Sequence, residues 1–317
     1  MPEKVLVTRE IPEVGIRLLD GFDITVLRER PPTRGELLEA VRGASGVLST
    51  ATERVDAEVM DAAGGTLRVV ANMAVGYDNI DLEAARERGV VVTNTPGVLD
   101  ETTADVAFML MLAAARRLGE AERLLRAGRW QWWGPKQLLG QDVWGGTLGI
   151  VGMGRIGQAV ARRAKGFGME VLYTSRSRKE GAERELGARQ MHLDELLRKS
   201  DFVSIHTPLT PETRHLIGPD ELAKMKRTAV LVNTSRGPVV DEAALADALA
   251  EGRIFAAGLD VYEEEPRVHP GLLKLDNVVL APHIGSASIE TRDRMARLAA
   301  KNLAAVLRGE EPPSRVV

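Results

Sequence analysis

A glycine-rich turn in the middle of the chain limits its fold more than any other feature. The apolar run Leu148–Val151 has the composition of a buried strand, and it leads directly into the sequence GMGRIG, residues 152–157. A helix is expected to open within Ile156–Ala161. A strand, a glycine turn and a helix in this order are the context that a dinucleotide-binding motif requires.

Each glycine of this pattern has a physical role. The first permits the tight turn, the second lets backbone approach a pyrophosphate, and the third lets the helix pack closely on the strand. The phosphates then lie at the helix N-terminus, where unpaired N–H groups and the helix dipole favour an anion. A purely structural turn is the alternative. The motif predicts a dinucleotide site that includes Gly152, Gly154, Arg155, Ile156 and Gly157.

Short apolar runs alternate with helical segments along most of the chain, which predicts an α/β fold with parallel sheets. In the first hundred residues we expect strands at Lys4–Thr8, Ile24–Leu27, Gly46–Ser49, Arg68–Ala71 and Val90–Thr93, and helices at Pro12–Leu19, Thr33–Val41 and Leu82–Arg88. A second series of strands begins at Leu148 and includes Val171–Thr174, Phe202–His206, Ala229–Asn233, Ala256–Asp260 and Asn277–Ala281. The glycine motif therefore opens a second domain.

Two long helical segments, Asp100–Arg117 and Ser288–Leu307, bracket this second series. The first has acidic residues in its first turn and is followed by Gly119, which is typical of a helix end. Its stretch Val106–Ala115 is apolar on nearly every side, so we expect it to be buried between domains or between subunits.

The simplest path leaves the first domain near Val98 and returns to it near Gly285. The prediction is two Rossmann-like, doubly wound parallel-sheet domains. A discontinuous, flavodoxin-like substrate domain takes residues 1–98 and 286–317, and a dinucleotide-binding domain takes residues 99–285.

Composition excludes several classes of function. The chain has 317 residues and contains no cysteine, which removes disulfides, thiolate catalysis and cysteine-based metal sites. A net charge of −3 gives no electrostatic signature of nucleic-acid binding. The first ten residues lack the apolar core of a signal peptide, and the longest apolar run is well short of a bilayer span. We expect a cytoplasmic protein with no membrane or nucleic-acid partner and no metal.

Ligands of open parallel α/β sheets bind outside the carboxyl ends of the strands, so polar residues at those positions are the candidates for chemistry. Arg236 follows one predicted strand, and its guanidinium could hold a carboxylate through two parallel hydrogen bonds. Asp260 to Glu265 follows another strand with four carboxylates. His283 ends the last strand, and an imidazolium suits proton donation near neutral pH. A carboxylate beside a histidine favours its protonated form and fixes its orientation.

The loop after Val171–Tyr173 is where a dinucleotide site selects its cofactor. An NAD site usually has Asp or Glu there to hold the ribose diol. Here the loop reads TSRSR, residues 174–178, without a carboxylate. The side chains of Ser175, Arg176 and Arg178 could hold a 2′-phosphate instead. We therefore expect NADP(H) to be preferred and NAD(H) to be possible; solvated loop charges are the alternative. His206, Thr207 and Pro208 end another strand and are expected to line the cofactor pocket.

All four tryptophans fall within residues 130–144, in a segment with little periodicity. They could anchor a loop by hydrophobic contact. They could also form a dimer arm whose aromatic rings line an active site, because tryptophan is enriched at interface hot spots.

Four ordered motifs together resemble the D-isomer-specific 2-hydroxyacid dehydrogenases, and among them the glyoxylate/hydroxypyruvate reductase branch. They are the glycine motif, Asn233–Gly237, the segment from Asp260 to Pro266, and Pro282–Gly285. The resemblance covers essentially the whole chain. It implies that a small 2-oxo acid is reduced by hydride transfer from NAD(P)H, and that the protein is a homodimer.

The resemblance also implies roles for individual residues. Arg236 clamps the substrate, Glu265 pairs with His283, and His283 protonates the carbonyl oxygen. Backbone N–H groups at Val75 and Gly76 bind the substrate carboxylate, and Trp133 reaches into an active site, either that of its own subunit or that of its neighbour. The remaining cofactor contacts implied are Thr103, Thr234, Ser235, Asp260 and Gly285.

Other functions remain open. Another D-2-hydroxyacid dehydrogenase, of the phosphoglycerate or D-lactate type, is the nearest alternative. Formate dehydrogenases resemble this family but carry Gln where Glu265 stands, which argues against them. A dinucleotide-sensing binding module, similar to the C-terminal-binding corepressors, is an alternative of a different class.

Overall fold

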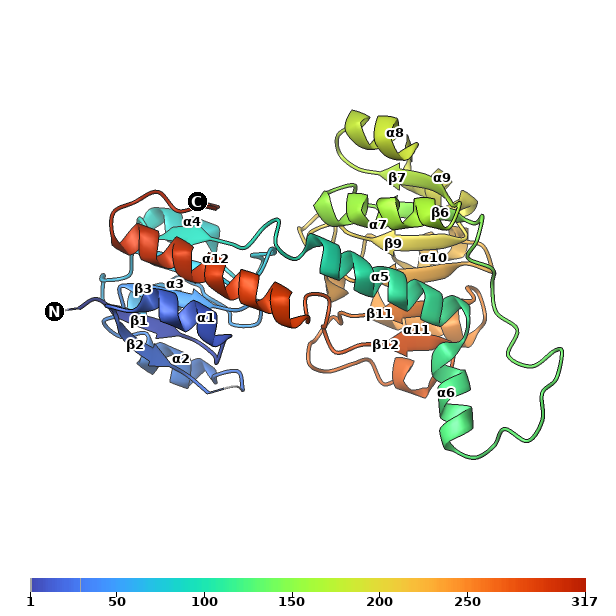
Figure 1. Cartoon of the computed structure of the whole chain (residues 1–317), viewed down its shortest axis with the longest axis horizontal. Coiled ribbons are helices and arrows are strands. Elements are labelled where there is room, and N and C mark those ends of the chain that lie inside the picture. Colours follow the sequence, from blue (N-terminus) through green and yellow to red (C-terminus); the bar gives the residue numbers. More distant parts are fainter. Residues whose placement is uncertain (1, 29) are drawn as a thin grey trace. The chain divides into compact units, whose positions relative to one another are not determined.

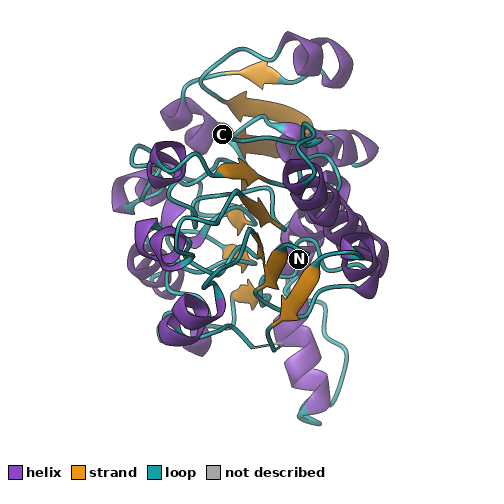
Figure 2. Cartoon of the chain, turned by 90° about the vertical axis from the view of Figure 1, so that its left-hand side faces the viewer, coloured by secondary structure: helices purple, strands orange, loops and turns teal. Residues whose placement is uncertain are grey.

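The computed structural model describes residues 2–28 and 30–317. The chain divides into two compact units, shown in Figure 1. Unit 1 contains Met1–Leu99 and Ser286–Val317, and unit 2 contains Asp100–Gly285. The helices lie on both sides of the strands (Figure 2). Within the described ranges, no helix is both long and apolar enough to cross a membrane.

Unit 1 is built on a five-stranded parallel sheet with the order β2-β1-β3-β4-β5. This is the flavodoxin-like order, with its switch point between β1 and β3, and it confirms the predicted fold class. The strands are short and mostly buried on both faces, which explains their continuous Val, Leu and Ile runs. Their bounds are β1 Lys4–Val7, β2 Asp23–Val26, β3 Gly46–Ser49, β4 Val69–Asn72 and β5 Val91–Thr93.

All described helices of unit 1 except α1 begin at a capping side chain. Thr33 forms a capping box with Glu36 at the start of α2, and Ser288 caps α12 through the N–H of Thr291. Helix α12 packs against α1, β3 and β4. Gly15 allows the close approach of α1, because a Cβ there would lie 2.9 Å from the Cβ of Ala296. The helices are α1 Glu13–Ile16, continued by a 3₁₀ turn, α2 Arg34–Ala40, α3 Ala57–Ala62, α4 Leu82–Glu87 and α12 Ile289–Leu307.

Unit 2 is built on a seven-stranded parallel sheet with the order β12-β11-β10-β9-β6-β7-β8. The order reverses between β6 and β9, as in a Rossmann fold, so the glycine motif after β6 lies at the switch point. Strand β8 was not predicted, because it has only two residues and both are exposed. The strands are β6 Thr147–Val151, β7 Glu170–Thr174, β8 Arg189–Gln190, β9 Phe202–Ile205, β10 Val230–Asn233, β11 Ala256–Leu259 and β12 Val278–Leu280.

The apolar helix of unit 2 differs from the prediction in two respects. Helix α5 ends at Ala115, and Arg117 adopts a left-handed backbone conformation before a second helix that contains Gly119. Gly119 is therefore not a stop signal. The buried side chains of α5 pack against α7, β10 and β11. The sequence predicts burial between domains or between subunits, but these side chains are buried within unit 2 itself. The helices are α5 Asp100–Ala115, α6 Leu118–Arg126, α7 Arg155–Gly166, α8 Glu180–Leu186, α9 Leu193–Lys199, α10 Pro219–Lys224 and α11 Glu242–Ala250.

Candidate active site

The three glycines of the motif have three different environments. Gly152 has a φ of 98°, and a Cβ there would lie 2.7 Å from the carbonyl of His206, so the turn passes directly over the end of β9. A Cβ at Gly157 would lie 2.3 Å from the carbonyl oxygen of Gly152, which explains how α7 packs against the turn. Around Gly154, by contrast, no described atom lies within 4 Å of such a Cβ. Steric demand thus explains two glycines, and the third borders open space.

The start of α7 offers hydrogen-bond donors to that space. Helix α7 has twelve residues, and the backbone N–H groups of Gly154, Arg155 and Ile156 donate to no described residue. Unpaired N–H groups at a helix N-terminus suit a phosphate. At the end of β10, the hydroxyl of Thr234 is buried without a hydrogen-bond partner in the described chain. These groups fit a dinucleotide, which would take its phosphates at α7.

His206 lies beside this turn at the end of β9. Its Nε2 is 2.8 Å from the hydroxyl of Ser204, and its backbone N–H donates to the carbonyl of Val151. Burial lowers the pKa of His206 to about 3, so the ring is neutral at physiological pH. Thr207 and Pro208 follow directly. His206 therefore borders the dinucleotide turn as a neutral group.

The loop after β7 contains one feature that the sequence did not reveal. Arg178 forms an ion pair with Glu183, whose carboxylate also accepts a hydrogen bond from the hydroxyl of Tyr173. These hydrogen bonds, from Arg178 first and Tyr173 second, lower the pKa of Glu183. Glu183 lies on α8, outside the loop, and no local pattern shows that it folds back. Arg178 is consequently engaged within the protein.

Arg176 in the same loop is different. Its side chain is exposed, and within the described ranges its charge acts on Glu212 without a hydrogen bond or ion pair between the two. The hydroxyl of Ser175 donates a hydrogen bond to the carbonyl of Ser177 at 2.6 Å. The loop thus presents the guanidinium of Arg176 as the cation that is available to a ligand.

The turn after β10 is shaped by Asn233. Its carboxamide oxygen accepts hydrogen bonds from the N–H and hydroxyl of Ser235, and its Nδ2 donates to the carbonyl of Arg236. Gly237 follows, and a Cβ there would lie 1.9 Å from the carbonyl carbon of Tyr262. The turns after β10 and β11 are therefore in direct backbone contact, which brings Arg236 close to the loop that carries Glu265.

Glu265 and His283 form the central pair of the site, although 18 residues separate them in sequence. His283 Nδ1 lies 2.7 Å from Glu265 Oε2, and the other carboxylate oxygen accepts the N–H of Tyr262. Burial raises the pKa of Glu265, but the hydrogen bond and charge of His283, with smaller contributions from the N–H of Tyr262 and the charge of Arg236, outweigh it and leave the pKa lowered. The Nε2 of His283 has no protein partner in the described chain, so it is available to a ligand.

The backbone at His283 is held in an unusual conformation, with a φ of 54°. A left-handed conformation is uncommon for residues other than glycine, and such residues are frequent at functional sites. Asp260 holds the following residues, because its fully buried carboxylate accepts the N–H groups of Ile284 and Gly285 at 2.7 Å each. A Cβ at Gly285 would lie 3.4 Å from the methyl group of Thr103, which places α5 beside this segment.

A second pair of carboxylates supports the loop that carries Glu265. The N–H of Glu263 donates to Glu242, and the N–H of Glu242 donates to Glu263, both at 2.8 Å. The buried carboxylate of Glu242 also accepts the N–H of His269. Glu242 could not be recognised from the sequence, because an acidic residue after Asp241 is typical of the start of a helix.

Two further groups of predicted site residues belong to other segments of the chain. Val75 and Gly76 belong to unit 1, in the loop after β4, and both are half-buried. Trp130, Trp132 and Trp133 lie in the loop after α6 and are 50%, 69% and 76% exposed. Because at least half of each residue's surface is exposed, these tryptophans do not anchor the loop in the core of this chain.

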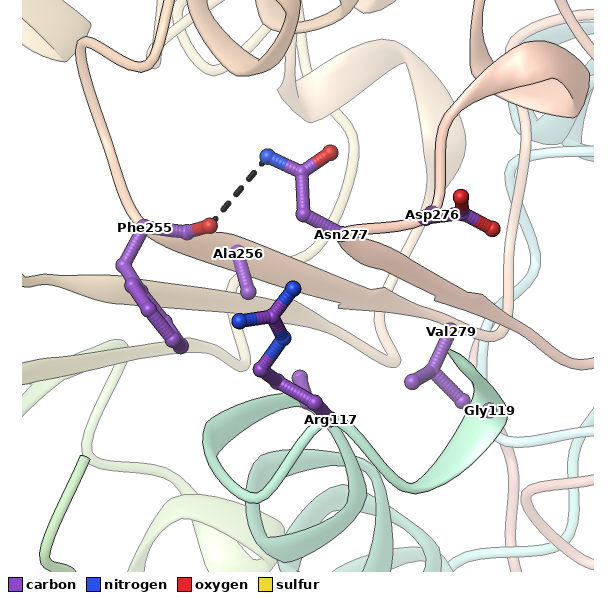
Figure 3. A pocket seen from close by; sticks show the side chains of 8 residues that line it. Arg117, Gly119, Phe255, Ala256, Asp276, Asn277 and Val279 are labelled. Carbon is purple, nitrogen blue, oxygen red and sulfur yellow. Dashed lines mark hydrogen bonds between the residues drawn. The ribbon is translucent and has the colours of Figure 1, made fainter. Parts of the chain in front are cut away.

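The structure also contains a cavity away from these residues. It measures about 160 Å³ and lies beside Arg117, Phe255 and Asn277 (Figure 3). Ala256 and Val278, the first residues of β11 and β12, show that this end of the sheet is the amino edge. Ligands of such sheets bind at the opposite, carboxyl edge. This cavity therefore lies outside the candidate active site.

Known proteins of similar sequence include 2-hydroxyacid dehydrogenases and glyoxylate reductases. The family model described as "D-isomer specific 2-hydroxyacid dehydrogenase, NAD binding domain" matches residues 108–285. A glyoxylate reductase of Korarchaeum cryptofilum is 57% identical over 321 residues, which cover 100% of this chain and 96% of the relative. A glyoxylate reductase of Thermococcus onnurineus is 56% identical, with the same shares covered.

Solved structures of similar proteins match this chain over 99% and 100% of its length. The TT0316 protein of Thermus thermophilus is 51% identical with a TM-score of 0.93, and the match covers 99% of this chain and 100% of that one. The NADPH-dependent glyoxylate/hydroxypyruvate reductase of Sinorhizobium meliloti, in complex with NADP and malonate, is 36% identical with a TM-score of 0.87 and coverage of 100% and 97%. The chain belongs to the D-isomer-specific 2-hydroxyacid dehydrogenase family.

Proposed function

We propose that this protein is an NADPH-preferring glyoxylate reductase that also accepts hydroxypyruvate. The observation that carries the proposal is the 2.7 Å contact between His283 and Glu265 at the carboxyl edge of the unit 2 sheet. The glyoxylate reductases that are more than 50% identical over the whole chain support the choice of substrate.

In the proposed reaction the reduced nicotinamide, when bound, supplies a hydride to the carbonyl carbon of the 2-oxo acid. His283 donates the proton from its Nε2 to the carbonyl oxygen, which becomes the hydroxyl of the product. Glu265 holds Nδ1, so the ring keeps its orientation and its positive charge is balanced before the transfer. The products are glycolate or D-glycerate and the oxidised dinucleotide.

Arg236 is proposed to hold the substrate carboxylate and to polarise the carbonyl, since a guanidinium presents two parallel N–H donors. The backbone N–H groups of Val75 and Gly76 are proposed to bind the same carboxylate. Thr103, Thr234, Ser235, Asp260 and Gly285 are proposed to border the cofactor.

The preference for NADP(H) is proposed from the loop after β7. It has no carboxylate to hold a ribose diol, and Arg176 is exposed and without an ion pair in the described chain. Ser175 is proposed as a second ligand of the 2′-phosphate. A phosphate that binds Arg178 would have to compete with Glu183, so Arg178 is proposed to contribute less to phosphate binding than Arg176.

We also propose a homodimer that uses the loop after α6. Figure 1 shows this loop projecting from its own unit between α6 and β6. Exposed aromatic side chains grouped on one segment are typical of protein interfaces. Trp133, the most exposed of them, is the candidate to reach an active site. Sedimentation analysis of the wild type and of Trp133→Ala tests this assignment.

The deciding experiment follows nicotinamide absorbance with NADPH and with NADH separately. Each is offered glyoxylate, hydroxypyruvate and pyruvate, and the oxidised dinucleotides are offered a phosphorylated three-carbon hydroxy acid. Rapid NADPH oxidation with the first two acids is the expected result. Faster turnover of pyruvate or of the phosphorylated acid would favour the D-lactate or phosphoglycerate type. No turnover with any of them would reject the proposal and favour a dinucleotide-sensing module.

A further inference from the structure

The loop after β4 in unit 1 is held by its carbonyl groups. Three consecutive carbonyl oxygens accept hydrogen bonds: Ala74 from the N–H of Thr95 at 2.8 Å, Val75 from Nδ2 of Asn94 at 2.8 Å, and Gly76 from Nδ2 of Asn72 at 2.9 Å. Two asparagine side chains from the ends of neighbouring strands β4 and β5 thus fix two peptide planes of this loop.

The other edge of each peptide plane carries an N–H group. In a trans peptide the N–H points away from the carbonyl, so anchored carbonyls leave the N–H groups of Val75, Gly76 and Tyr77 directed away from their anchors. None of the three N–H groups donates a hydrogen bond to any residue in ranges 2–28 and 30–317. Successive unpaired N–H groups of this kind are suited to bind an anion.

The orientation of the Asn72 side chain is itself fixed. The residue is fully buried, and its Oδ1 accepts the hydroxyl hydrogen of Ser49. Its Nδ2 donates both to Gly76 and to Oδ1 of Asn79, whose own Nδ2 donates to the carbonyls of Thr50 and Glu53. A flipped amide would place oxygen against the carbonyl of Gly76, so the network permits one orientation only.

Asn94 is supported from the other side by the end of the chain. Its carbonyl oxygen accepts hydrogen bonds from Nδ2 of Asn302 on α12 and from the hydroxyl of Ser314. The backbone beyond Ser314 pairs with β5, because the N–H of Val316 donates to the carbonyl of Val92. The residue that orients the Val75 peptide is thus held by α12 and by the C-terminal strand-like segment.

We propose that Asn72 and Asn94 are positioning residues for substrate, which set the N–H groups of Val75, Gly76 and Tyr77 to bind the carboxylate of a 2-oxo acid. This inference rests on the proposed function, and it adds two side chains and a third N–H group to it. Neither asparagine touches the reacting atoms. They act by fixing peptide planes before the substrate arrives, so their effect belongs to carboxylate affinity.

The test compares Asn94→Ala and Asn94→Asp with the wild-type enzyme. Loss of a well-oriented hydrogen bond to a charged group typically weakens binding by about tenfold or more. We expect KM for glyoxylate to rise by about that factor in Asn94→Ala, with kcat within about threefold and KM for NADPH unchanged. Asn94→Asp should raise KM further, because its oxygen repels the carbonyl of Val75.

Oxalate supplies a readout that does not depend on turnover. As a carboxylate that cannot be reduced, it should bind to the wild-type enzyme with NADPH present and lose affinity in parallel with glyoxylate. Asn72→Ser, which shortens the other anchor, should act in the same direction. The inference is overturned if both Asn94 variants keep the wild-type KM and oxalate affinity. A wild type that binds oxalate but does not reduce glyoxylate would instead count against the proposed function.

Asn277 provides the matched control. Its Nδ2 also donates to two backbone carbonyls, those of Leu249 and Phe255, but it lies at the amino edge of the other sheet (Figure 3). Asn277→Ala should lower the unfolding temperature without moving KM. If Asn277→Ala raised KM as much as Asn94→Ala does, the effect would be one of general stability and the inference would fail.

Discussion

Gly237→Ala tests whether the backbone contact between two turns builds the candidate active site. An added Cβ would lie 1.9 Å from the carbonyl carbon of Tyr262 and 2.4 Å from the nitrogen of Glu263. Carbon atoms in contact normally lie about 3.5 Å apart, so the two turns must separate by roughly 1.5 Å. Both neighbouring groups are backbone, and neither can rotate away as a side chain could.

This separation acts on stability and on catalysis. Overpacking of a tightly packed region typically costs about 1–3 kcal/mol of unfolding free energy. Arg236 precedes Gly237, whereas Glu265 and its partner His283 belong to the other side of the contact. A displacement of about 1 Å can lower a rate by about 10²-fold. We therefore expect kcat/KM for glyoxylate to fall by about two orders of magnitude, and dinucleotide affinity to fall much less.

The assay combines NADPH oxidation, cofactor titration by fluorescence and thermal unfolding. Gly166→Ala is the control, because a Cβ at this last residue of α7 meets no described atom within 4 Å. It should be neutral or slightly stabilising, since alanine is the better helix former. If Gly237→Ala kept both the wild-type unfolding temperature and the wild-type kcat/KM, the contact between the turns would not be what positions Arg236 against Glu265.

Three further predictions concern the chemistry. His283→Ala should lower kcat by about 10²–10⁴-fold, the usual contribution of general acid–base catalysis, while NADPH still binds; an unchanged rate would remove His283 as the proton donor. Arg176→Ala should raise KM for NADPH more than KM for NADH, and Arg178→Ala should do so less because Glu183 already holds Arg178; equal effects on both cofactors would contradict the phosphate assignment. The folded pKa of Glu265 is lowered, because the charge and hydrogen bond of His283 outweigh the opposing effect of burial. Its charge therefore stabilises the fold fully above the ordinary carboxyl pKa, and the stabilisation is lost as pH falls through the lowered pKa. The unfolding temperature of Glu265→Gln should be lower than that of the wild type at neutral pH, and the two temperatures should converge in acid. A difference in unfolding temperature that does not change with pH would contradict the lowered pKa.

The parallel sheets were predictable because their signals are local. Each buried strand is a short apolar run, and the glycine motif combines strand, turn and helix within about fifteen residues. The helix that begins after Ser288 was also predictable, because a capping residue precedes an amphipathic stretch. The end of α5 was not, since Arg117 adopts a left-handed conformation that the sequence gives no reason to expect.

The candidate site was predictable where a strand end determines it. Arg236 and His283 lie three residues after the last residues of β10 and β12, and the carboxyl ends of parallel strands meet at one edge of a sheet. Glu183 was not predictable, because it lies on α8 and returns to the cofactor loop through its contact with Tyr173. The ion pair between Glu183 and Arg178 depends on the fold. The number of arginines in the loop therefore overstates the positive charge that is available to a phosphate.

Asn72 and Asn94 also lie at the carboxyl ends of strands, in the sheet of unit 1. Asn72 ends one apolar run and Asn94 follows another, so the preference of ligands for strand ends marks both positions. What this preference cannot supply is their role. An asparagine at a strand end can face a ligand or can hold a neighbouring loop, and only the direction of its amide decides between the two. Here both Nδ2 groups point to loop carbonyls, so the donors left for an anion belong to the backbone, where no residue type records them. The sequence can therefore indicate a carboxylate site of this kind only through the asparagines that fix its backbone.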